Sequence, residues 1–309
     1  MNILITGGAG FIGSHLADHL LSEGHSITII DNLSSGKIEN ISANCKLIIA
    51  DINDIELLNQ VFNDINFCYH MAAIPSVQKS TDNWVECHRT NLEGTINIFL
   101  QASKKNIPVI YASSAAVYGD LDVFPLSEDS KVKMLSPYGV DKYSCELQAE
   151  AFAHIYGLKT IGLRFFNVYG LRQDPNSPYS GVISVFTDNI KNNRPINVYG
   201  DGLQQRDFVY INDVVKALIL ARDDMLMNNA NKQQKMFKDS KIYNICTGHG
   251  VTINSLIQNL FELSGREVPV NYLPKREGDI YKSIGNPQKA HEIGFNALTS
   301  LSTGLKVLL

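Results

Sequence analysis

A tyrosine and a lysine four residues apart are the pair in this 309-residue sequence best suited to chemistry. Tyr138 and Lys142 lie in SPYGVDKYSCE, residues 136–146. On a helix this spacing places both side chains on one face, where the ammonium favours the ionised phenol. Such a phenol can act as a general base near neutral pH. The pair alone is also common on solvated helix faces, so its meaning depends on its surroundings.

Two serines supply part of those surroundings. Ser113 and Ser114 follow the apolar run 109–112, which predicts a strand ending at a ligand-binding edge. We expect one of the two hydroxyls to hydrogen-bond to a substrate hydroxyl.

A glycine turn at the N-terminus predicts a dinucleotide site. The apolar run 3–6 leads into TGGAGFIG, with Gly7, Gly10 and Gly13 at a strand-to-helix junction. Glycines let the backbone approach a pyrophosphate, and the helix N-terminus offers free N–H groups. The next expected strand ends in Asp31, which can accept hydrogen bonds from the ribose diol and would repel a 2′-phosphate. The pattern therefore favours NAD over NADP.

These residues require an alternating α/β framework. Apolar runs at residues 3–6, 26–31, 46–51, 67–72 and 108–113 are separated by helix-length segments. Further strands are expected at 159–165, 196–200 and 241–246. This alternation predicts a Rossmann doubly wound parallel sheet with a smaller C-terminal lobe. We place the boundary near residue 170, with segments near 205–222 and 241–246 returning to the first domain, and surface loops at 171–181 and 228–240.

Composition excludes several classes of function. The net charge is −4, the mean hydropathy is −0.06, and no long basic run or transmembrane-length apolar run occurs. We expect no nucleic-acid or membrane partner, no metal, and a cytoplasmic location, because the N-terminus is a strand and not a leader. The five scattered cysteines are expected to be buried free thiols: Cys45, Cys68, Cys87, Cys145 and Cys246.

Seven motifs together resemble a known family. They are TGGAGFIG, HMAA, NLEGT, SSAAVYG, YGVDK, LRFFNVYG and RDFVYINDV. The chain resembles the extended short-chain dehydrogenase/reductases that act on nucleotide sugars, above all the UDP-hexose 4-epimerases and their UDP-N-acetylglucosamine branch. The resemblance implies an NAD-binding domain at 1–170 and a mainly nucleotide-sugar-binding lobe at 171–309.

The resemblance also assigns roles to residues. Ser114 would bind the sugar hydroxyl, Tyr138 would be base and acid, and Lys142 would hold Tyr138 and the nicotinamide ribose. Beside the glycines and Asp31, the expected NAD-binding residues are Phe11, Ile12, Asn32, Asp51, Ile52, Ala72, Ala73 and Asn91. Asp51 could equally cap a helix. The expected substrate residues besides the serines and Tyr138 are Asn167, Val182, Asn197, Tyr199, Arg206, Arg276, Asp279 and Ser283. Planar arginine donors suit a diphosphate.

Two small residues narrow the range of expected reactions. Ala115 and Ala116 follow Ser114 where related dehydratases and decarboxylases carry acidic groups, so proton transfer for elimination is disfavoured. We expect 4-epimerisation through a transient 4-keto sugar, with hydride returned to the opposite face and NAD retained. A 4,6-dehydratase, a decarboxylase, a 4-keto reductase and a non-catalytic nucleotide-binding protein are the alternatives. Uridine and thymidine nucleotides stay open.

A small side chain at residue 283 predicts which sugars the substrate pocket admits. In the resembling family a bulky residue there restricts the pocket to plain hexoses, whereas Ser283 would admit a 2-acetamido group. UDP-GlcNAc and UDP-GalNAc are thus the preferred pair, with the plain UDP-hexoses as alternatives and an incidental loop role for Ser283 also open. Helices near 85–104 and 137–156 carry additional apolar positions, which the resemblance assigns to a homodimer, although internal packing would also explain them.

Overall fold

A seven-stranded parallel sheet organises the first part of the molecule. The computed structural model describes residues 1–309 except 176, 178–180, 231–239 and 277–279. Within these residues the strand order is β10-β6-β5-β4-β1-β2-β3, and every neighbouring pair is parallel. The strands are β1 (Asn2–Thr6), β2 (Ser26–Asp31), β3 (Lys46–Ile49), β4 (Phe67–His70), β5 (Val109–Ser114), β6 (Thr160–Phe165) and β10 (Lys241–Ile245). This confirms the Rossmann prediction.

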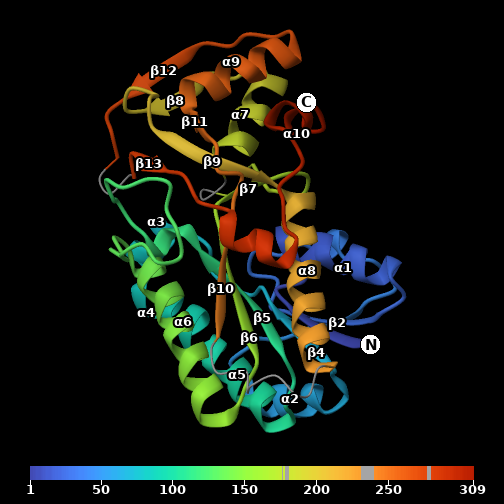
Figure 1. The fold of residues 1–309 in the computed structure, drawn as a ribbon. Helices are drawn as coiled ribbons and strands as arrows, with labels where there is room; N and C mark the ends of the chain where they lie inside the picture. The colour runs from blue at the N-terminus through green and yellow to red at the C-terminus, as the bar shows by residue number, and fades with distance from the viewer. Residues whose placement is uncertain (176, 178–180, 231–239, 277–279) are drawn as a thin grey trace.

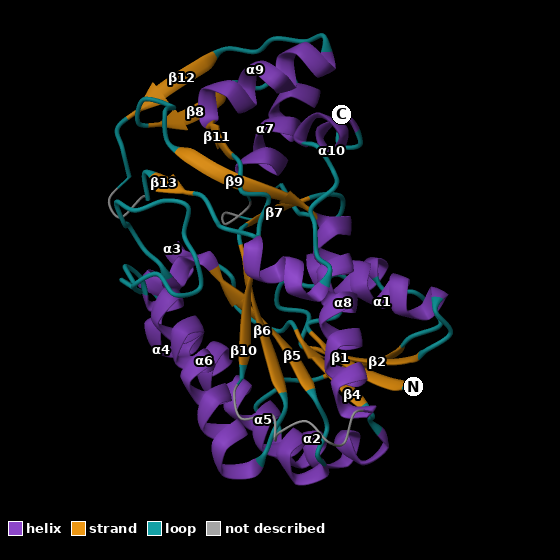
Figure 2. Ribbon diagram, viewed as in Figure 1, coloured by secondary structure: helices purple, strands orange, loops and turns teal. Residues whose placement is uncertain are grey.

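Helices cover both faces of this sheet (Figures 1 and 2). Side chains alternate along β1: Ile3 and Ile5 pack with α1 and α8, whereas Leu4 packs with α2, α5 and α6. The helices of this layer are α1 (Phe11–Ser22), α2 (Ile55–Val61), α3 (Val77–Asp82), α4 (Trp84–His88), α5 (Gly94–Lys105), α6 (Pro137–Tyr156) and α8 (Ile211–Ala230). The helix expected over 85–104 is in fact α4 and α5 joined by a π-helical turn, residues 89–93.

Smaller sheets lie beyond the end of the large one (Figure 2). One contains β7 (Asn167–Tyr169), β9 (Gln205–Tyr210), β11 (Gly250–Thr252) and β13 (Lys282–Ser283), and the other pairs β8 (Ile196–Tyr199) with β12 (Val270–Leu273). They pack with α7 (Val182–Lys191), α9 (Ile253–Ser264) and α10 (Leu301–Lys306).

The late strands divide between the sheets. β10 joins the large sheet, as the sequence suggested, whereas β8 and β9 belong to the smaller ones. Of the segment 205–222 only α8 returns to the first layer, where it packs beside α1. α8 extends to Ala230, so the loop expected from residue 228 begins later, and most of it lies outside the described residues, as does part of the loop 171–181. The boundary near residue 170 stays a prediction.

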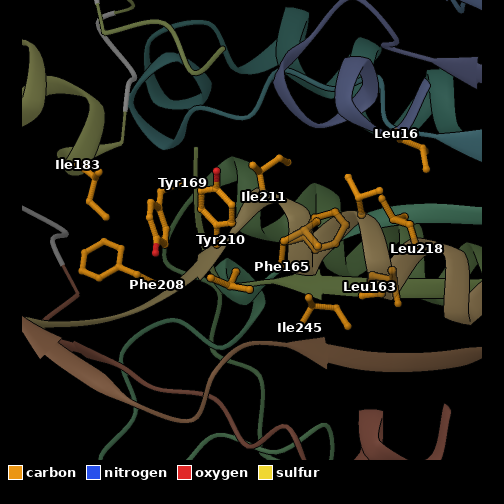
Figure 3. Close-up of a cluster of buried hydrophobic side chains, with 14 of the residues drawn as sticks. Leu16, Leu163, Phe165, Tyr169, Ile183, Phe208, Tyr210, Ile211, Leu218 and Ile245 are labelled. Carbon is orange, nitrogen blue, oxygen red and sulfur yellow. The ribbon is translucent and has the colours of Figure 1, made fainter. Parts of the chain in front are cut away.

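One hydrophobic cluster joins the large sheet and its helices to the smaller sheets (Figure 3). It runs from Leu16 and Leu163 beside the large sheet, through Phe165 and Tyr210, to Ile183 on α7. A continuous close-packed core resists shear. The smaller sheets are therefore held firmly over the carboxyl ends of the parallel strands.

All five cysteines are free thiols, four buried and Cys45 partly exposed. In the described parts of the chain, no helix has the length and apolarity needed to cross a bilayer. No group of three metal-ligating side chains of the His, Cys, Asp and Glu types occurs among those residues either.

Candidate active site

The glycine turn after β1 forms a cradle that larger residues would fill. Gly7 has φ +68°, and a Cβ there would lie 2.6 Å from the backbone nitrogen of Ala72. A Cβ on Gly13 would lie 2.3 Å from the carbonyl oxygen of Gly7. α1 begins at Phe11, and its N-cap residue, Gly10, makes no side-chain cap. The first N–H groups of α1 are thus available to a phosphate, as the NAD prediction requires.

Asp31 ties the end of β2 to this cradle. Its carboxylate is 8% exposed and accepts hydrogen bonds from the backbone N–H groups of Ala9 and Leu33, each at 2.9 Å. Asn32 is next in the chain, and its amide nitrogen lies 3.5 Å from a carboxylate oxygen of Asp51. The three polar residues expected at the adenosine end therefore lie on one edge of the sheet, beside the turn.

Asp51 and Ile52 follow β3 and contribute differently. Asp51 accepts hydrogen bonds from the backbone and the side chain of Asn53, at 2.8 and 3.0 Å, and the cap of α2 is Asp54 instead. Ile52 is 4% exposed and packs against Gly94. The helix-cap alternative for Asp51 is thus wrong.

Asn91 shapes the loop after β4. It is fully buried in the π-helical turn; its amide oxygen accepts from the backbone N–H of Ile74 at 2.8 Å, and its amide nitrogen donates to the carbonyl of the same residue at 3.2 Å. Asn91 therefore holds the loop that contains Ala72 and Ala73, two of the expected NAD-binding residues.

Sequence reasoning missed a histidine beneath that loop. His70 is fully buried, with Nδ1 2.7 Å from Thr6 Oγ1 and Nε2 2.9 Å from Thr95 Oγ1. Burial lowers the pKa of this imidazole to about 3, so the ring is neutral at physiological pH. Its place in HMAA, at a strand end, was the available signal. His70 links β1, β4 and α5 beside the glycine turn.

Tyr138 and Lys142 share one face of α6, as their spacing predicted. Ser136 caps the helix by accepting from the N–H of Gly139, and Pro137 occupies the first turn. Lys142 Nζ lies 5.9 Å from the centre of the Tyr138 ring and donates to the carbonyl of Ala112 at 2.8 Å. Both side chains are at most 8% exposed. The ammonium is thereby fixed between the phenol and the end of β5.

The two serines at the end of β5 have different hydrogen-bond partners. Ser114 Oγ accepts from the N–H of Ala116 at 3.1 Å, which leaves its own hydroxyl proton to donate. Ser113 is 2% exposed, and its hydroxyl donates to Glu146 Oε1 inside the protein. Substrate contact by the Ser113 hydroxyl is therefore a wrong expectation, since alternate residues of a strand face opposite sides.

The smaller sheets gather several expected substrate residues. Ser283 on β13 pairs with Arg206 on β9, and Asn167 on β7 pairs with Phe208 on the same strand. The Arg206 guanidinium donates to the carbonyl of Gln205 at 3.0 Å. β9 thus carries the cation and pairs with the strands that carry the serine and the asparagine.

A cavity of about 220 Å³ opens beside these strands, with Tyr199, Gln204 and Lys275 in its lining. The Arg276 guanidinium lies 3.6 Å from the centre of the Tyr199 ring, a cation–π contact. Val182 begins α7, and the Asn197 amide oxygen accepts from Asn271 at 3.1 Å. Asp279 lies outside the described residues.

A second missed residue fixes the strand that carries Arg206. Asp207 is fully buried and accepts from the backbone N–H and the hydroxyl of Thr247 and from the N–H groups of Gly248 and Gly285. Burial raises the pKa of this carboxyl despite these donors. Asp207 joins β9 to the segments that follow β10 and β13.

Comparison with known proteins agrees with this geometry. The NAD dependent epimerase/dehydratase family model matches residues 3–246. The chain belongs to that family. Its cofactor is NAD, and the uncapped N-terminus of α1 and the glycine cradle fit that cofactor.

Two solved structures and one curated relative illustrate the range of the family. A UDP-glucose 4-epimerase from Thermotoga maritima, solved with UDP-glucose, has a TM-score of 0.92 and 38% identity, covering 100% of this chain and 97% of the other. A UDP-N-acetylglucosamine 4-epimerase from Methanobrevibacter ruminantium, solved with UDP-N-acetylmuramic acid, has a TM-score of 0.91 and 35% identity, covering 99% and 96%. A UDP-N-acetyl-alpha-D-glucosaminuronate decarboxylase from Bacillus cytotoxicus is 34% identical over 88% of this chain and 83% of its own. The protein is an NAD-dependent enzyme of the epimerase/dehydratase type.

Proposed function

We propose that the protein interconverts UDP-hexoses that differ in configuration at C4, with UDP-GlcNAc and UDP-GalNAc as the preferred pair. The observation that carries the proposal is the arrangement at the end of β5. There α6 holds Tyr138 and Lys142 beside the strand that ends in Ser114, and two alanines follow this serine. A phenol with its ammonium partner can remove a hydroxyl proton, whereas Ala115 and Ala116 can transfer none. The relatives that carry epimerase names support this choice.

Each side chain then has a defined task. The Tyr138 phenolate takes the proton of the 4-hydroxyl and returns it at the end of the cycle, and the Ser114 hydroxyl donates a hydrogen bond to the same oxygen. The hydrogen bond to the Ala112 carbonyl fixes the position of the Lys142 ammonium beside the phenol. Bound NAD supplies the acceptor and donor of hydride at C4. Epimerisation follows if the 4-keto sugar turns its other face to the cofactor before the phenol returns its proton.

The smaller sheets would hold the nucleotide while the hexose turns. Arg206 and Arg276 would bind the diphosphate, with Asn167, Val182, Asn197 and Tyr199 lining the rest of the site and Asp279 as a further candidate. Ligands named for the solved relatives are UDP sugars, which supports uridine. Strong anchoring at the diphosphate leaves the sugar free to rotate.

Ser283 supports the preference for acetamido sugars. On β13 it is the register partner of Arg206 on β9, next to the expected position of the diphosphate. A small side chain at this position would leave space for a 2-acetamido group. Decarboxylation, the activity in the name of the Bacillus cytotoxicus relative, is the second candidate. The two alanines after Ser114 argue against it.

We also propose that two copies associate through α4 and α6, which lie side by side (Figure 1). The exposed apolar side chains on these helices are Trp84, Val85, Val140, Leu147, Ile155 and Tyr156. Exposed apolar side chains on two neighbouring helices favour a partner surface, and a second copy of the chain would bury them symmetrically. The cytoplasmic location stays a prediction from the sequence.

An assay of four UDP sugars tests the proposed reaction. Purified protein without added cofactor is incubated separately with UDP-GlcNAc, UDP-GalNAc, UDP-glucose and UDP-galactose, and the products are separated by chromatography. We expect interconversion within each pair, faster for the acetamido pair, and NAD in the extract of the denatured protein. A separate reaction with UDP-glucuronic acid tests decarboxylation. Activity that requires added NADPH, or release of carbon dioxide from UDP-glucuronic acid by a protein that interconverts none of the four hexoses, would contradict the proposal.

A further inference from the structure

A buried ion pair lies one helical turn beyond Lys142. Glu146 on α6 is 6% exposed and Arg164 on β6 is 4% exposed. Arg164 Nε donates to Glu146 Oε1 at 2.9 Å, and Nη2 donates to Oε2 at 2.6 Å. This two-bond geometry fixes both the position and the orientation of the carboxylate.

The same carboxylate contacts the strand that carries Ser114. Glu146 Oε1 also accepts the hydroxyl proton of Ser113. The residue before Ser113 is Ala112, whose carbonyl accepts from Lys142. α6 and the end of β5 are therefore joined at two successive points, Lys142 to residue 112 and Glu146 to residue 113.

The arginine is held from its other side. Its Nη1 donates to the hydroxyl of Tyr118 at 2.8 Å, and that hydroxyl donates to Asn244 Oδ1 at 2.6 Å. The guanidinium also lies 4.8 Å from the centre of the Tyr118 ring. These contacts connect β6, β10 and the segment after β5, so Arg164 provides a rigid support for Glu146.

We propose that Glu146 and Arg164, acting through Ser113, are positioning residues that set the register of α6 against β5. Tyr138, Lys142 and Glu146 lie at successive turns of one helix face, so a shift of Glu146 moves the phenol and the ammonium relative to Ser114. Ser113, Glu146 and Arg164 use their polar side-chain atoms on one another and on other protein groups, so the proposal gives none of them a contact with the substrate. The inference rests on the proposed 4-epimerase function and adds the residues that align its reacting groups.

Ser113→Ala tests this role with the smallest disturbance, because it keeps the ion pair and removes only the bond to the strand. We expect kcat for the interconversion of UDP-GlcNAc and UDP-GalNAc to fall about 10- to 100-fold, since a small misplacement of reacting groups has effects of this size. The dissociation constant for UDP and the retained NAD should stay within about twofold of wild type. Glu150→Gln, an exposed position one turn beyond Glu146 on α6, should leave all three quantities unchanged.

Arg164→Lys is the second variant, because it keeps the charge and loses the two-bond geometry. We expect a lower kcat per UDP-binding site, with sites counted by calorimetry. A role in stability alone would lower the melting temperature and the number of sites and leave kcat per site at the wild-type value in both variants. That result would overturn the positioning proposal. If the wild-type protein binds UDP and interconverts no UDP-hexose, the proposed function fails and this inference fails with it.

Discussion

At the scale of single residues, the proposed preference for acetamido sugars rests on the small side chain of Ser283 beside Arg206. Ser283 lies opposite this arginine on the neighbouring strand and is 9% exposed, so a larger side chain there must project into the space next to it. Under the proposed function, a serine side chain would leave room for an acetamido substituent, whereas a phenol would not. We therefore expect one substitution at this position to alter the substrate preference.

Ser283→Tyr should lower kcat/KM for UDP-GlcNAc and UDP-GalNAc roughly 10- to 200-fold relative to the plain UDP-hexoses, the range typical of steric selection in a pocket. Ser283→Ala is the matched control and should retain both pairs of substrates. The measurement is initial rates with each of the four sugars. Unimpaired turnover of the acetamido sugars by the tyrosine variant would show that Ser283 does not control their entry.

Buried polar residues mark the limit of what the sequence predicted at this scale. Tyr138, Lys142 and the glycines have fixed local spacing, so they could be identified without a structure. Glu146 and Asp207 could not, because their partners are remote in sequence: Arg164 for the first, and Thr247 and Gly285 for the second. Ser113 was misassigned because sequence does not show which face of β5 meets the substrate.

At the scale of elements, we expect the turn between β1 and α1 to determine whether NAD binds. Gly13→Ala should cost about 1–3 kcal/mol of stability by overpacking, since the new methyl group would lie 2.3 Å from the Gly7 carbonyl oxygen. Because the turn is displaced, the variant should lose most of its NAD. Ser22→Ala at the exposed far end of the same helix is the control. The NAD content is measured from the absorbance of the denatured extract. Full retention of NAD by Gly13→Ala would show that the glycine turn does not hold the cofactor.

The junction of β1, β4 and α5 makes stability depend on pH through His70. Burial lowers the pKa of the folded-state imidazole from its usual 6.5 to about 3, so the unfolded chain binds the proton first. This contribution is complete above about pH 6.5 and is lost as the pH falls towards about 3, with a slope approaching 1.4 kcal/mol per pH unit.

Urea unfolding of His70→Gln and wild type at several pH values between 7 and 4 isolates this effect, because the other titrating groups are common to both. The stability difference between the two proteins should shrink as the pH falls. Ser22→Ala, an exposed position on α1 that carries no titrating group, should differ from wild type by a constant amount. A constant difference for His70→Gln as well would show that the ring is not buried in its neutral form.

Strand positions were predicted well, and strand partners less well. β1, β2 and β5 are marked by apolar β-branched runs with turn residues at their ends, which are local signals. β8 also carries such a run, but its partner β12 is more than 60 residues away, and nothing local shows that the pair stands apart from the large sheet. The smaller sheets therefore had to come from the structure.

At the scale of the whole molecule, the apolar face on α4 and α6 predicts a dimer. Leu147 is 49% exposed near the middle of α6, and a symmetric interface there would bury it. Leu147→Glu should raise the dimer dissociation constant at least roughly 100-fold, because it buries a charge without a partner.

Sedimentation velocity at several concentrations measures this change. Leu298→Glu, at a 73% exposed site remote in sequence from α4 and α6, is the control and should leave the dimer intact. Dimers that persist unchanged in Leu147→Glu, or wild-type protein that sediments as a monomer at every concentration, would show that this face does not bind a second copy.

In the proposed reaction one phenol, held beside an ammonium on α6, moves the proton on which epimerisation depends. The most direct measurement is the rate of UDP-GlcNAc and UDP-GalNAc interconversion by Tyr138→Phe, normalised to the UDP-binding sites of the purified protein. The account predicts a loss of about 100- to 10,000-fold with UDP affinity and NAD content retained. Turnover at the wild-type rate in this variant would contradict it.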